Sequence, residues 1–504
     1  MNRTKHLQRP ILWVALIIGS IPLLGAEHIF EDASKSLGLS LGGGQVSWGD
    51  FNNDGWEDLH DGGLWVNERG KKFSRFNGQG PSGHGIWGDY NNDGWLDFYS
   101  WSSGKLYRNE KGKEFVDVTP KALTERPMKV SRGAAWVDMD NDGYLDLYVA
   151  GYEIWQKAVY PDALYRNMGG KDFVTHTLPK VRNMSARGVS AADFDADGDV
   201  DVYVSNYRLF PNRLWRNDGE GKFIEIATPS STAGDGGLGA WGHTIGSAWG
   251  DLDNDGYLDL FVGNFSHPPA YQDRPKFLRN RGPDGKFAFE DKSSGAGLHW
   301  QESYASPALA DYDNDGHLDL FFTTVYAGNT SVLYRNNGNW KFNNTTSPSG
   351  IRTAQTYQSA WCDFDKDGDL DLASGGKLWR NRGNSNKWLA MKLEGTDKVN
   401  RAAIGTTVRL KVGEQILTRH VNSSTGEGNQ NSLILHFGLG PNPPKELEVT
   451  VLWPGNTQKK QLVEVGKFNT IKKQKPLVFL RQHRKAGRHK SSSVCCSASP
   501  LCGD

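Results

Sequence analysis

The sequence predicts an all-β protein: a seven-bladed β-propeller followed by a small antiparallel β-domain. Three observations predict it. An acidic loop, Asp-x-(Asp/Asn)-x-Asp-Gly-x-x-Asp, recurs seven times at intervals of 39 to 60 residues. A strand motif ending in Asn, most often Leu-Tyr-Arg-Asn or Leu-Trp-Arg-Asn, follows every loop. Glycine and tryptophan are abundant, with 60 and 18 of 504 residues. Such repeats are typical of propeller blades.

Each repeat is expected to form four strands. In the third repeat, strand one covers 134–137 and leads into the acidic loop, and strand two covers 146–149. Strand three carries the motif that ends at Asn167, and strand four holds a late aromatic residue, such as Phe115 in the second repeat. The alternating β-branched and aromatic residues on both sides of the loops favour strands over helices.

The seventh repeat stops after strand three, at Leu378–Asn381. The missing outer strand resembles residues 28–34 near the N-terminus, His-Ile-Phe-Glu-Asp-Ala-Ser. We expect this segment to complete blade seven and close the ring. The alternative is an open solenoid, in which each repeat contacts only its neighbours.

The loop chemistry predicts a calcium site in each blade. Calcium takes about six to eight oxygen ligands, and alternate residues of a tight loop can direct oxygens at one centre. In the third loop, Asp138, Asp140 and Asp142 supply side-chain oxygens. The carbonyl of Tyr144 adds another, and Asp146 closes the shell. Glycine at position six permits the positive φ of the turn. Magnesium or manganese in some loops, or a turn without metal, are the alternatives.

The first two loops have Asn52 and Asn91 at position three, so these sites lose one negative charge and should bind metal more weakly. The loop is not an EF-hand, because no Glu stands at position twelve. The expected metal positions are Asp50, Asn52, Asp54, Trp56, Asp58, Asp89, Asn91, Asp93, Trp95, Asp97, Asp138, Asp140, Asp142, Tyr144, Asp146, Asp193, Asp195, Asp197, Asp199, Asp201, Asp251, Asp253, Asp255, Tyr257, Asp259, Asp311, Asp313, Asp315, His317, Asp319, Asp363, Asp365, Asp367, Asp369 and Asp371.

The chain is expected to divide into a signal peptide (1–26), the propeller (27–386), the β-domain (387–475) and a disordered basic tail (476–504). Residues 1–26 combine basic residues with an apolar run, as secretory signals do. A single uncleaved anchor is the alternative. We therefore expect a secreted, extracellular protein, or a periplasmic one in a bacterium, with no membrane span after cleavage.

Only four cysteines occur, so the propeller is not a disulfide scaffold. Cys362 lies in strand one of blade seven and is expected to be a buried free thiol. Cys495, Cys496 and Cys502 form an odd-numbered cluster in the tail that pairs or cross-links. With so few cysteines, we expect metal ions to stabilise the blades.

After Asn381 the acidic loops stop, and strands are expected at 388–393, 407–412, 433–437 and 447–453. The acidic loops with their Asn-terminated strands resemble the FG-GAP/VCBS repeats of integrin-α-like propellers. The segments 400–408, 436–440 and 451–455 resemble the ASPIC/UnbV domain, although Ala403 stands where that family usually has Gly. The combination resembles the cartilage acidic protein family. No calcium-binding EGF-like module follows.

The sequence contains no serine-hydrolase elbow, zinc-protease motif, Walker loop or Cys-x-x-Cys pair. His84, His243 and His299 precede strand-one segments. A surface or structural role is expected for them, and a catalytic or ligand-contacting role is the alternative. The leading hypothesis is a monomeric calcium-binding module for an extracellular protein or an anionic glycan, with no nucleic-acid partner. A lyase-like polysaccharide enzyme and an accessory protein of a biosynthetic or surface-assembly system are the alternatives.

Overall fold

The computed structural model describes residues 28–234, 241–266, 274–396 and 398–474. The expected signal peptide and the cysteines of the tail lie outside the described residues. The described residues up to Lys473 belong to one compact unit. Among the described residues, no helix is long and apolar enough to cross a membrane.

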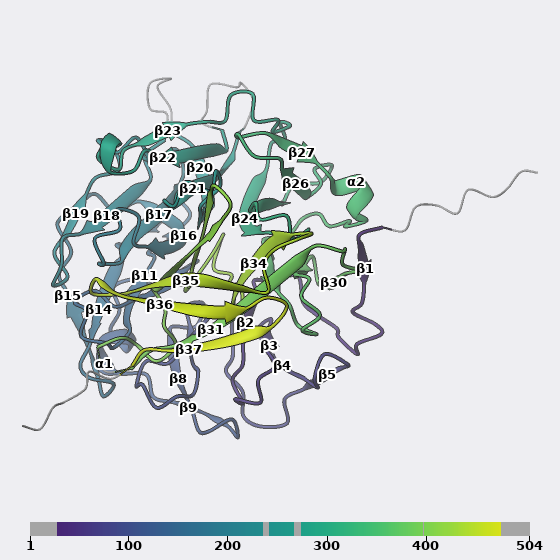
Figure 1. Cartoon of the computed structure of the whole chain (residues 1–504). Coiled ribbons are helices and arrows are strands. Elements are labelled where there is room, and N and C mark those ends of the chain that lie inside the picture. Colours follow the sequence, from purple (N-terminus) through teal and green to yellow (C-terminus); the bar gives the residue numbers. More distant parts are fainter. Residues whose placement is uncertain (1–27, 235–240, 267–273, 397, 475–504) are drawn as a thin grey trace, which may run out of the picture. The chain divides into compact units, whose positions relative to one another are not determined.

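Seven four-stranded antiparallel sheets form the blades of the propeller (Figure 1). Blade one consists of β2 (Ser47–Gly49), β3 (Asp58–His60), β4 (Leu64–Asn67) and β5 (Phe73–Arg75), and blade two of β6 (Ile86–Gly88), β7 (Asp97–Ser100), β8 (Lys105–Asn109) and β9 (Phe115–Asp117). Blade three consists of β10 (Ala134–Val137), β11 (Asp146–Val149), β14 (Ala163–Asn167) and β15 (Phe173–His176), and blade four of β16 (Ser185–Ala192), β17 (Asp201–Tyr207), β18 (Arg213–Asn217) and β19 (Phe223–Glu225). Blade five consists of β20 (His243–Gly250), β21 (Asp259–Phe265), β22 (Lys276–Asn280) and β23 (Phe289–Asp291), and blade six of β24 (Tyr304–Ala310), β25 (Asp319–Thr324), β26 (Val332–Asn336) and β27 (Phe342–Asn344).

Blade seven contains both ends of the propeller sequence. Its strands are β28 (Ala360–Cys362), β29 (Asp371–Ser374), β30 (Lys377–Asn381) and, outermost, β1 (Phe30–Asp32). β1 pairs antiparallel with β30, with Phe30 opposite Asn381. The first strands of successive blades contact one another in a closed cycle, β2, β6, β10, β16, β20, β24, β28 and back to β2. The predicted closure by the N-terminal strand is therefore confirmed, and the open solenoid is wrong.

Two short helices connect blades: α1 (Lys121–Thr124) lies between blades two and three, and α2 (Thr346–Ser349) lies between blades six and seven. The 3-10 helix η2 (Pro283–Gly285) lies within blade five, and the hairpin of β12 (Glu153–Ile154) with β13 (Ala158–Val159) lies within blade three. Large aromatic side chains fill the space between blades. Trp48, Trp87 and Trp136, each from strand one of its blade, are fully buried.

The C-terminal domain has two sheets, β34-β31-β37 and β33-β32-β35-β36. Its strands are β31 (Lys387–Glu394), β32 (Thr407–Val412), β33 (Gln415–His420), β34 (Leu435–Gly440), β35 (Glu446–Trp453), β36 (Thr457–Glu464) and β37 (Phe468–Lys472). The pairs are antiparallel except β31 with β37, which is parallel. The strands expected from the sequence do not include β33, β36 or β37. Most residues of β36 are polar and exposed, without apolar alternation.

One segment of this domain enters the axis of the ring. We call residues 421–431 the axial loop; all are buried except Asn422 and Asn431, which are partly exposed. The loop hydrogen-bonds to six of the seven blades. The blade residues in these bonds are Trp48, Trp87, Val189, Ser247, Ser306 and Trp361.

The sequence Gly426-Glu427-Gly428 suits this position. Both glycines have positive φ, 59° and 67°. A Cβ atom on Gly426 would lie 2.2 Å from the hydroxyl oxygen of Ser306, so no larger residue fits without displacement. At Gly426 the backbone thus passes close to the inner strands of the propeller, where a larger residue would not fit.

Candidate metal centres

The acidic loops share one geometry, shown here by the third. Its fourth and sixth residues, Asn141 and Gly143, have φ of 54° and 93°. The two oxygens of Asp138 accept hydrogen bonds from the backbone N–H groups of Asp142 and Gly143, both at 3.1 Å. Asp142 in turn accepts from the N–H of Tyr144 at 2.9 Å. These hydrogen bonds turn the chain so that the carboxylates of Asp138, Asp140 and Asp146 point toward a common centre.

The residue at position three carries the clearest sign of a missing partner. In the five loops with Asp at this position, its Oδ1 atom is buried and accepts no hydrogen bond from any described residue. These residues are Asp140, Asp195, Asp253, Asp313 and Asp365. A buried oxygen without a donor costs about 1–3 kcal/mol, and more if it is charged. The same atom lacks a donor in five loops, so each of these loops could hold a cation there.

Carboxylate oxygens from three aspartates lie within 4.8 Å of one another in loops three to seven. The groups are Asp138, Asp140 and Asp146; Asp193, Asp195 and Asp197; Asp251, Asp253 and Asp255; Asp311, Asp313 and Asp315; Asp363, Asp365 and Asp371. This set of hard oxygen donors fits Ca²⁺. Loops one and two, with Asn52 and Asn91 at position three, form no such group among the described residues; their weaker metal binding stays a prediction.

Burial raises the pKa of the first aspartate of these loops, and the neighbouring carboxylates raise it further. The pKa of Asp138 rises to about 8 and that of Asp193 to about 7. The pKa of Asp251 also rises to about 8, again chiefly because of burial. Close carboxylates of this kind require a bound cation or a proton to remain together.

The arginine of the strand-three motif contacts the position-three carboxylate in four of these five loops. Arg279 lies 2.6 Å from Asp253, and Arg335 lies 2.5 Å from Asp313. Arg166 with Asp140 and Arg380 with Asp365 form the other two pairs. Each arginine binds an Oδ2 atom and leaves Oδ1 free for a metal.

The asparagine of the same motif joins neighbouring blades. The backbone N–H of Asn167 donates to Oδ1 of Asp146, the ninth loop residue, at 2.6 Å. Its side-chain amide donates to the carbonyl of Leu145 and to that of Tyr90 in the preceding blade, at 2.9 and 2.8 Å. The equivalent contact to the preceding blade recurs in every blade. The ninth aspartate therefore also holds strand three in place.

Sequence analysis missed a further link between loops. Asparagine at position four donates its side-chain amide to the glycine carbonyl of the next loop, as Asn92 does to Gly143 at 2.7 Å and Asn314 to Gly368 at 3.0 Å. Asn53 and Asn254 make the same contact. The signal was present in the sequence, because five of the seven loops have Asn at this position.

The C-terminal domain lies on the face of the propeller that carries the loops, in front of the ring in Figure 1. Gly438 donates its N–H to Oδ2 of Asp311 at 3.0 Å. Arg401 donates its N–H to the side chain of Asn92 at 2.8 Å. Further contacts join Lys392 with Asp50, Gly455 with Gly198 and Ile416 with Asn254. The domain thus covers the loops of at least five blades.

Where the axial loop passes through the ring, it forms a buried polar cluster with aromatic surroundings. Glu427 accepts a hydrogen bond from Nε of Arg187 at 2.7 Å. The guanidinium lies 4.9 Å from the ring centroid of Tyr357, 5.3 Å from that of Tyr207 and 5.5 Å from that of Tyr152. Sequence analysis did not identify this cluster, because its residues come from blades three, four and seven and from the C-terminal domain.

The histidines singled out by the sequence do not form one site. His84 contacts the carbonyl of Gln45 at 3.0 Å and stacks on Trp101. His243 is buried at the start of β20, and the backbone N–H of His299 donates to the Tyr334 hydroxyl at 2.8 Å. Cys362 is a buried free thiol, as predicted.

Comparison with known proteins agrees with this architecture. Residues 89–149, 206–262, 251–322 and 311–374 match the FG-GAP-like repeat, and residues 395–477 match ASPIC and UnbV. Cartilage acidic protein 1 of Homo sapiens is 26% identical over 362 residues, which cover 64% of this chain and 50% of that protein. Its counterpart in Xenopus tropicalis is 27% identical over 314 residues, which cover 56% of this chain and 44% of that protein.

The chain spans about half the length of the curated relatives it matches. A solved structure of the Photorhabdus luminescens Tc holotoxin pore aligns with a TM-score of 0.31 and 15% identity, over 81% of this chain and 19% of that one. The chain carries FG-GAP-like repeats followed by an ASPIC and UnbV domain, and it is related to cartilage acidic protein 1.

Proposed function

We propose that the protein is an extracellular binding module whose propeller is made rigid by calcium. One observation carries the proposal: the buried, partnerless Oδ1 atom at position three in each of five loops. The three-carboxylate groups in the same loops supply the ligands. The name of the relatives, which refers to cartilage, supports an extracellular location. Within this proposal, the propeller spans 27–386 and the second domain 387–475.

Calcium would act by neutralising carboxylates that otherwise repel one another under the C-terminal domain. Asp311 illustrates the coupling, because its carboxylate belongs to a metal group and also accepts the N–H of Gly438. Filling these loops would stabilise both the blade edges and the contact between domains. Ligand binding to the folded state alone raises stability in proportion to the logarithm of ligand concentration.

Thermal unfolding during a calcium titration tests this proposal. The melting temperature of the full chain should rise with calcium and fall again with EDTA. Calorimetry should count about five strong sites, since five loops hold three clustered carboxylates. Magnesium in place of calcium provides the control for ion selectivity. An unchanged melting temperature in EDTA would refute the role of metal.

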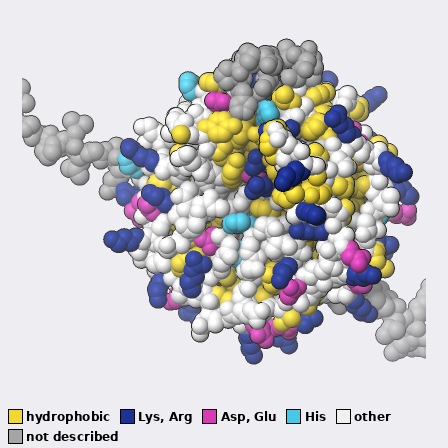
Figure 2. Space-filling model, turned by 180° about the vertical axis from the view of Figure 1, so that it is seen from behind, with side chains coloured by type: hydrophobic (Ala, Val, Ile, Leu, Met, Phe, Trp, Pro, Cys, Tyr) yellow, Lys and Arg dark blue, Asp and Glu magenta, His cyan; other side chains and the backbone are white. Residues whose placement is uncertain are grey.

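We propose that the partner, an extracellular protein or an anionic glycan, binds the face opposite the C-terminal domain, because that domain covers the loops on its own side. Figure 2 shows the molecule from behind, with apolar and basic side chains gathered in its upper part. Trp155 of the hairpin after β11 is 57% exposed, and the Arg208 guanidinium lies 3.7 Å from its ring. Exposed aromatic residues beside arginine are typical of such interfaces.

A screen of extracellular proteins and sulfated or uronic glycans, with Trp155→Ala as the variant, tests this surface. The variant should bind the partner at least tenfold more weakly while its melting temperature stays unchanged. Trp300→Ala is the matched control, because Trp300 is also exposed, at 47%, but lies in the connection between blades five and six. Equal binding by both variants would place the partner elsewhere.

A further inference from the structure

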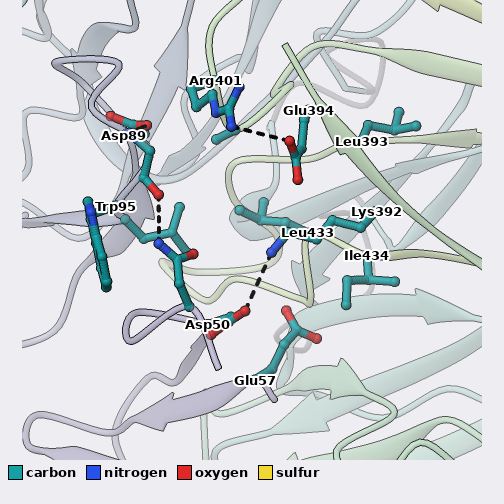
Figure 3. A pocket seen from close by; sticks show the side chains of 14 residues that line it. Asp50, Glu57, Asp89, Trp95, Lys392, Leu393, Glu394, Arg401, Leu433 and Ile434 are labelled. Atoms are coloured by element: carbon teal, nitrogen blue, oxygen red, sulfur yellow. Dashed lines mark hydrogen bonds and ion pairs between the residues drawn. The ribbon is translucent and has the colours of Figure 1, made fainter. Parts of the chain in front are cut away.

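A cavity of about 340 Å³ lies where the loops of blades one and two meet β31 of the C-terminal domain (Figure 3). Asp50, Glu57 and Asp89 line it from the propeller, and Lys392 and Arg401 line it from the second domain. A volume of this size at a domain interface is typical of sites for small molecules. A single metal ion would leave most of it unfilled.

Loop one differs from loops three to seven beside this cavity and in its lining. Position three is Asn52, a change shared with loop two, and the strand-three arginine is replaced by Val66; neither residue lines the cavity. Position eight is Glu57, whereas the other six loops have Leu or Val there. Among the described residues, loop one gathers no group of three carboxylates. It is therefore less suited to calcium than loops three to seven and carries an additional acid.

Asp50 lines this cavity, and one of its carboxylate oxygens has no hydrogen-bond donor. Its side chain is 9% exposed, and its Oδ1 atom accepts no hydrogen bond from any described residue. In each of the other six loops, Oδ1 of the first aspartate accepts the N–H of position five at 3.0 or 3.1 Å. In loop one the N–H of Asp54 donates to Asn52 instead. The free oxygen requires a donor from elsewhere.

Glu57 adds a second carboxylate on the same side of the cavity (Figure 3). It is 5% exposed, and the thiol of Cys362 donates to its Oε2 atom at 3.1 Å. A buried carboxylate is costly unless a cationic or hydrogen-bonding partner compensates it. Two such groups side by side favour a ligand with several N–H donors.

The apolar residues that line the rest of the cavity indicate that the ligand also has an apolar part. Leu433 and Ile434 of the C-terminal domain line the cavity near the carboxylates, together with Trp95 of loop two. The ammonium of Lys392 lies 3.4 Å from Oδ2 of Asp50, so an alkylammonium group already fits this corner. A ligand with an aliphatic part would pack against these apolar side chains, and its amine would bind the carboxylates of Asp50 and Glu57.

We propose that this cavity binds a small organic cation, a primary ammonium group on an aliphatic body. Asp50 and Glu57 hold the ammonium, and Lys392 competes with it for Asp50. The C-terminal domain supplies the apolar half, so both domains contribute to the site. The inference is independent of calcium in loops three to seven, none of which lines this cavity.

Isothermal titration of the full chain with n-hexylamine tests the proposal, with 1-hexanol and hexanoate as the neutral and anionic counterparts. Hexylamine should bind with a stoichiometry of one, and both counterparts should bind at least tenfold more weakly. Glu57→Leu introduces the residue type that most other loops have at this position, and it should weaken the binding of hexylamine at least tenfold. Lys392→Met removes the competing ammonium group and should strengthen the binding of hexylamine.

Glu448→Leu is the matched control, because Glu448 is exposed on β35 away from the cavity. Its affinity for hexylamine should equal that of the unchanged chain. Equal binding of hexanol and hexylamine, no binding of hexylamine, or full retention of binding in Glu57→Leu would each overturn the proposal. The melting temperature of Glu57→Leu in calcium and in EDTA reports separately on the metal sites, so the two proposals fail independently.

Discussion

Arg187 of blade four and Glu427 of the axial loop form an ion pair in the interior of the ring, with side chains 7% and 0% exposed. They are 240 positions apart in the sequence. The pair connects the C-terminal domain to the inner wall of the propeller. Burial raises the pKa of Glu427, and the positive charge of Arg187 opposes the shift.

Glu427→Gln should destabilise the protein by about 3–5 kcal/mol, because it leaves the Arg187 charge buried without its counterion. The double variant Arg187→Met with Glu427→Leu should lose less than the sum of the two single changes. Urea unfolding of the unchanged chain, Arg187→Met, Glu427→Leu and the double variant measures this coupling. A strictly additive result would show that the pair does not link the two domains.

Deletion of residues 28–34 should prevent folding of the propeller. β1 supplies the outer strand of blade seven, and Phe30 is buried against Tyr312 and Trp361. Without it, an edge of the sheet and the apolar surface of blades six and seven would face water. Circular dichroism and solubility of the truncated chain measure the effect. A soluble product that melts cooperatively would contradict ring closure by this strand.

Asp313→Asn should remove one strong calcium site, since it takes a carboxylate from the group with Asp311 and Asp315. Asn91→Asp should have the opposite effect and add a site in loop two, where only the charge at position three is missing. Calorimetric titration counts the ions in both variants. Unchanged counts in both would show that position three does not ligate the metal.

His420 should make stability depend on pH. It is buried, and burial lowers its pKa from 6.5 to about 4. The unfolded chain therefore binds a proton between about pH 6.5 and pH 4 that the folded chain does not bind, so stability falls as pH falls through this window. From pH 7 to pH 5 the loss attributable to His420 is about 2 kcal/mol.

His420→Gln should remove this part of the pH dependence, whereas His28→Gln, at an exposed position, should not. Urea unfolding of the three chains at about pH 7 and about pH 5 measures the difference. Identical pH dependence in all three would mean that His420 takes up a proton in the folded protein.

Gly426→Ala should destabilise the protein even though it adds one methyl group. The residue has a φ of 59°, and the new Cβ would overlap the hydroxyl of Ser306. A loss of about 1–3 kcal/mol is typical of overpacking at a closed site. Gly413→Ala is the matched control, because its φ is also positive, at 61°, but nothing lies within 4 Å of the added atom. Thermal melting of both variants separates crowding from backbone strain.

Local patterns allowed much of the molecule to be predicted. The acidic loop is nine residues long, and its turn depends on residues within that span, as the bonds from Asp142 and Gly143 to Asp138 show. The strands on either side alternate in a way that identifies them. The match of residues 28–34 to the missing strand predicted closure, because a repeat that lacks one element indicates where that element must come from.

By itself, the sequence determined the seven blades, the closure of the ring and the position of the acidic loops. Only the tertiary structure decided that the axial loop enters the ring, that Arg187 meets Glu427, and that Asp50, Glu57 and Lys392 enclose one cavity. The reason is physical. Turns and strands arise from bonds between near neighbours, whereas these contacts join segments hundreds of residues apart, whose pairing depends on how two folded domains pack.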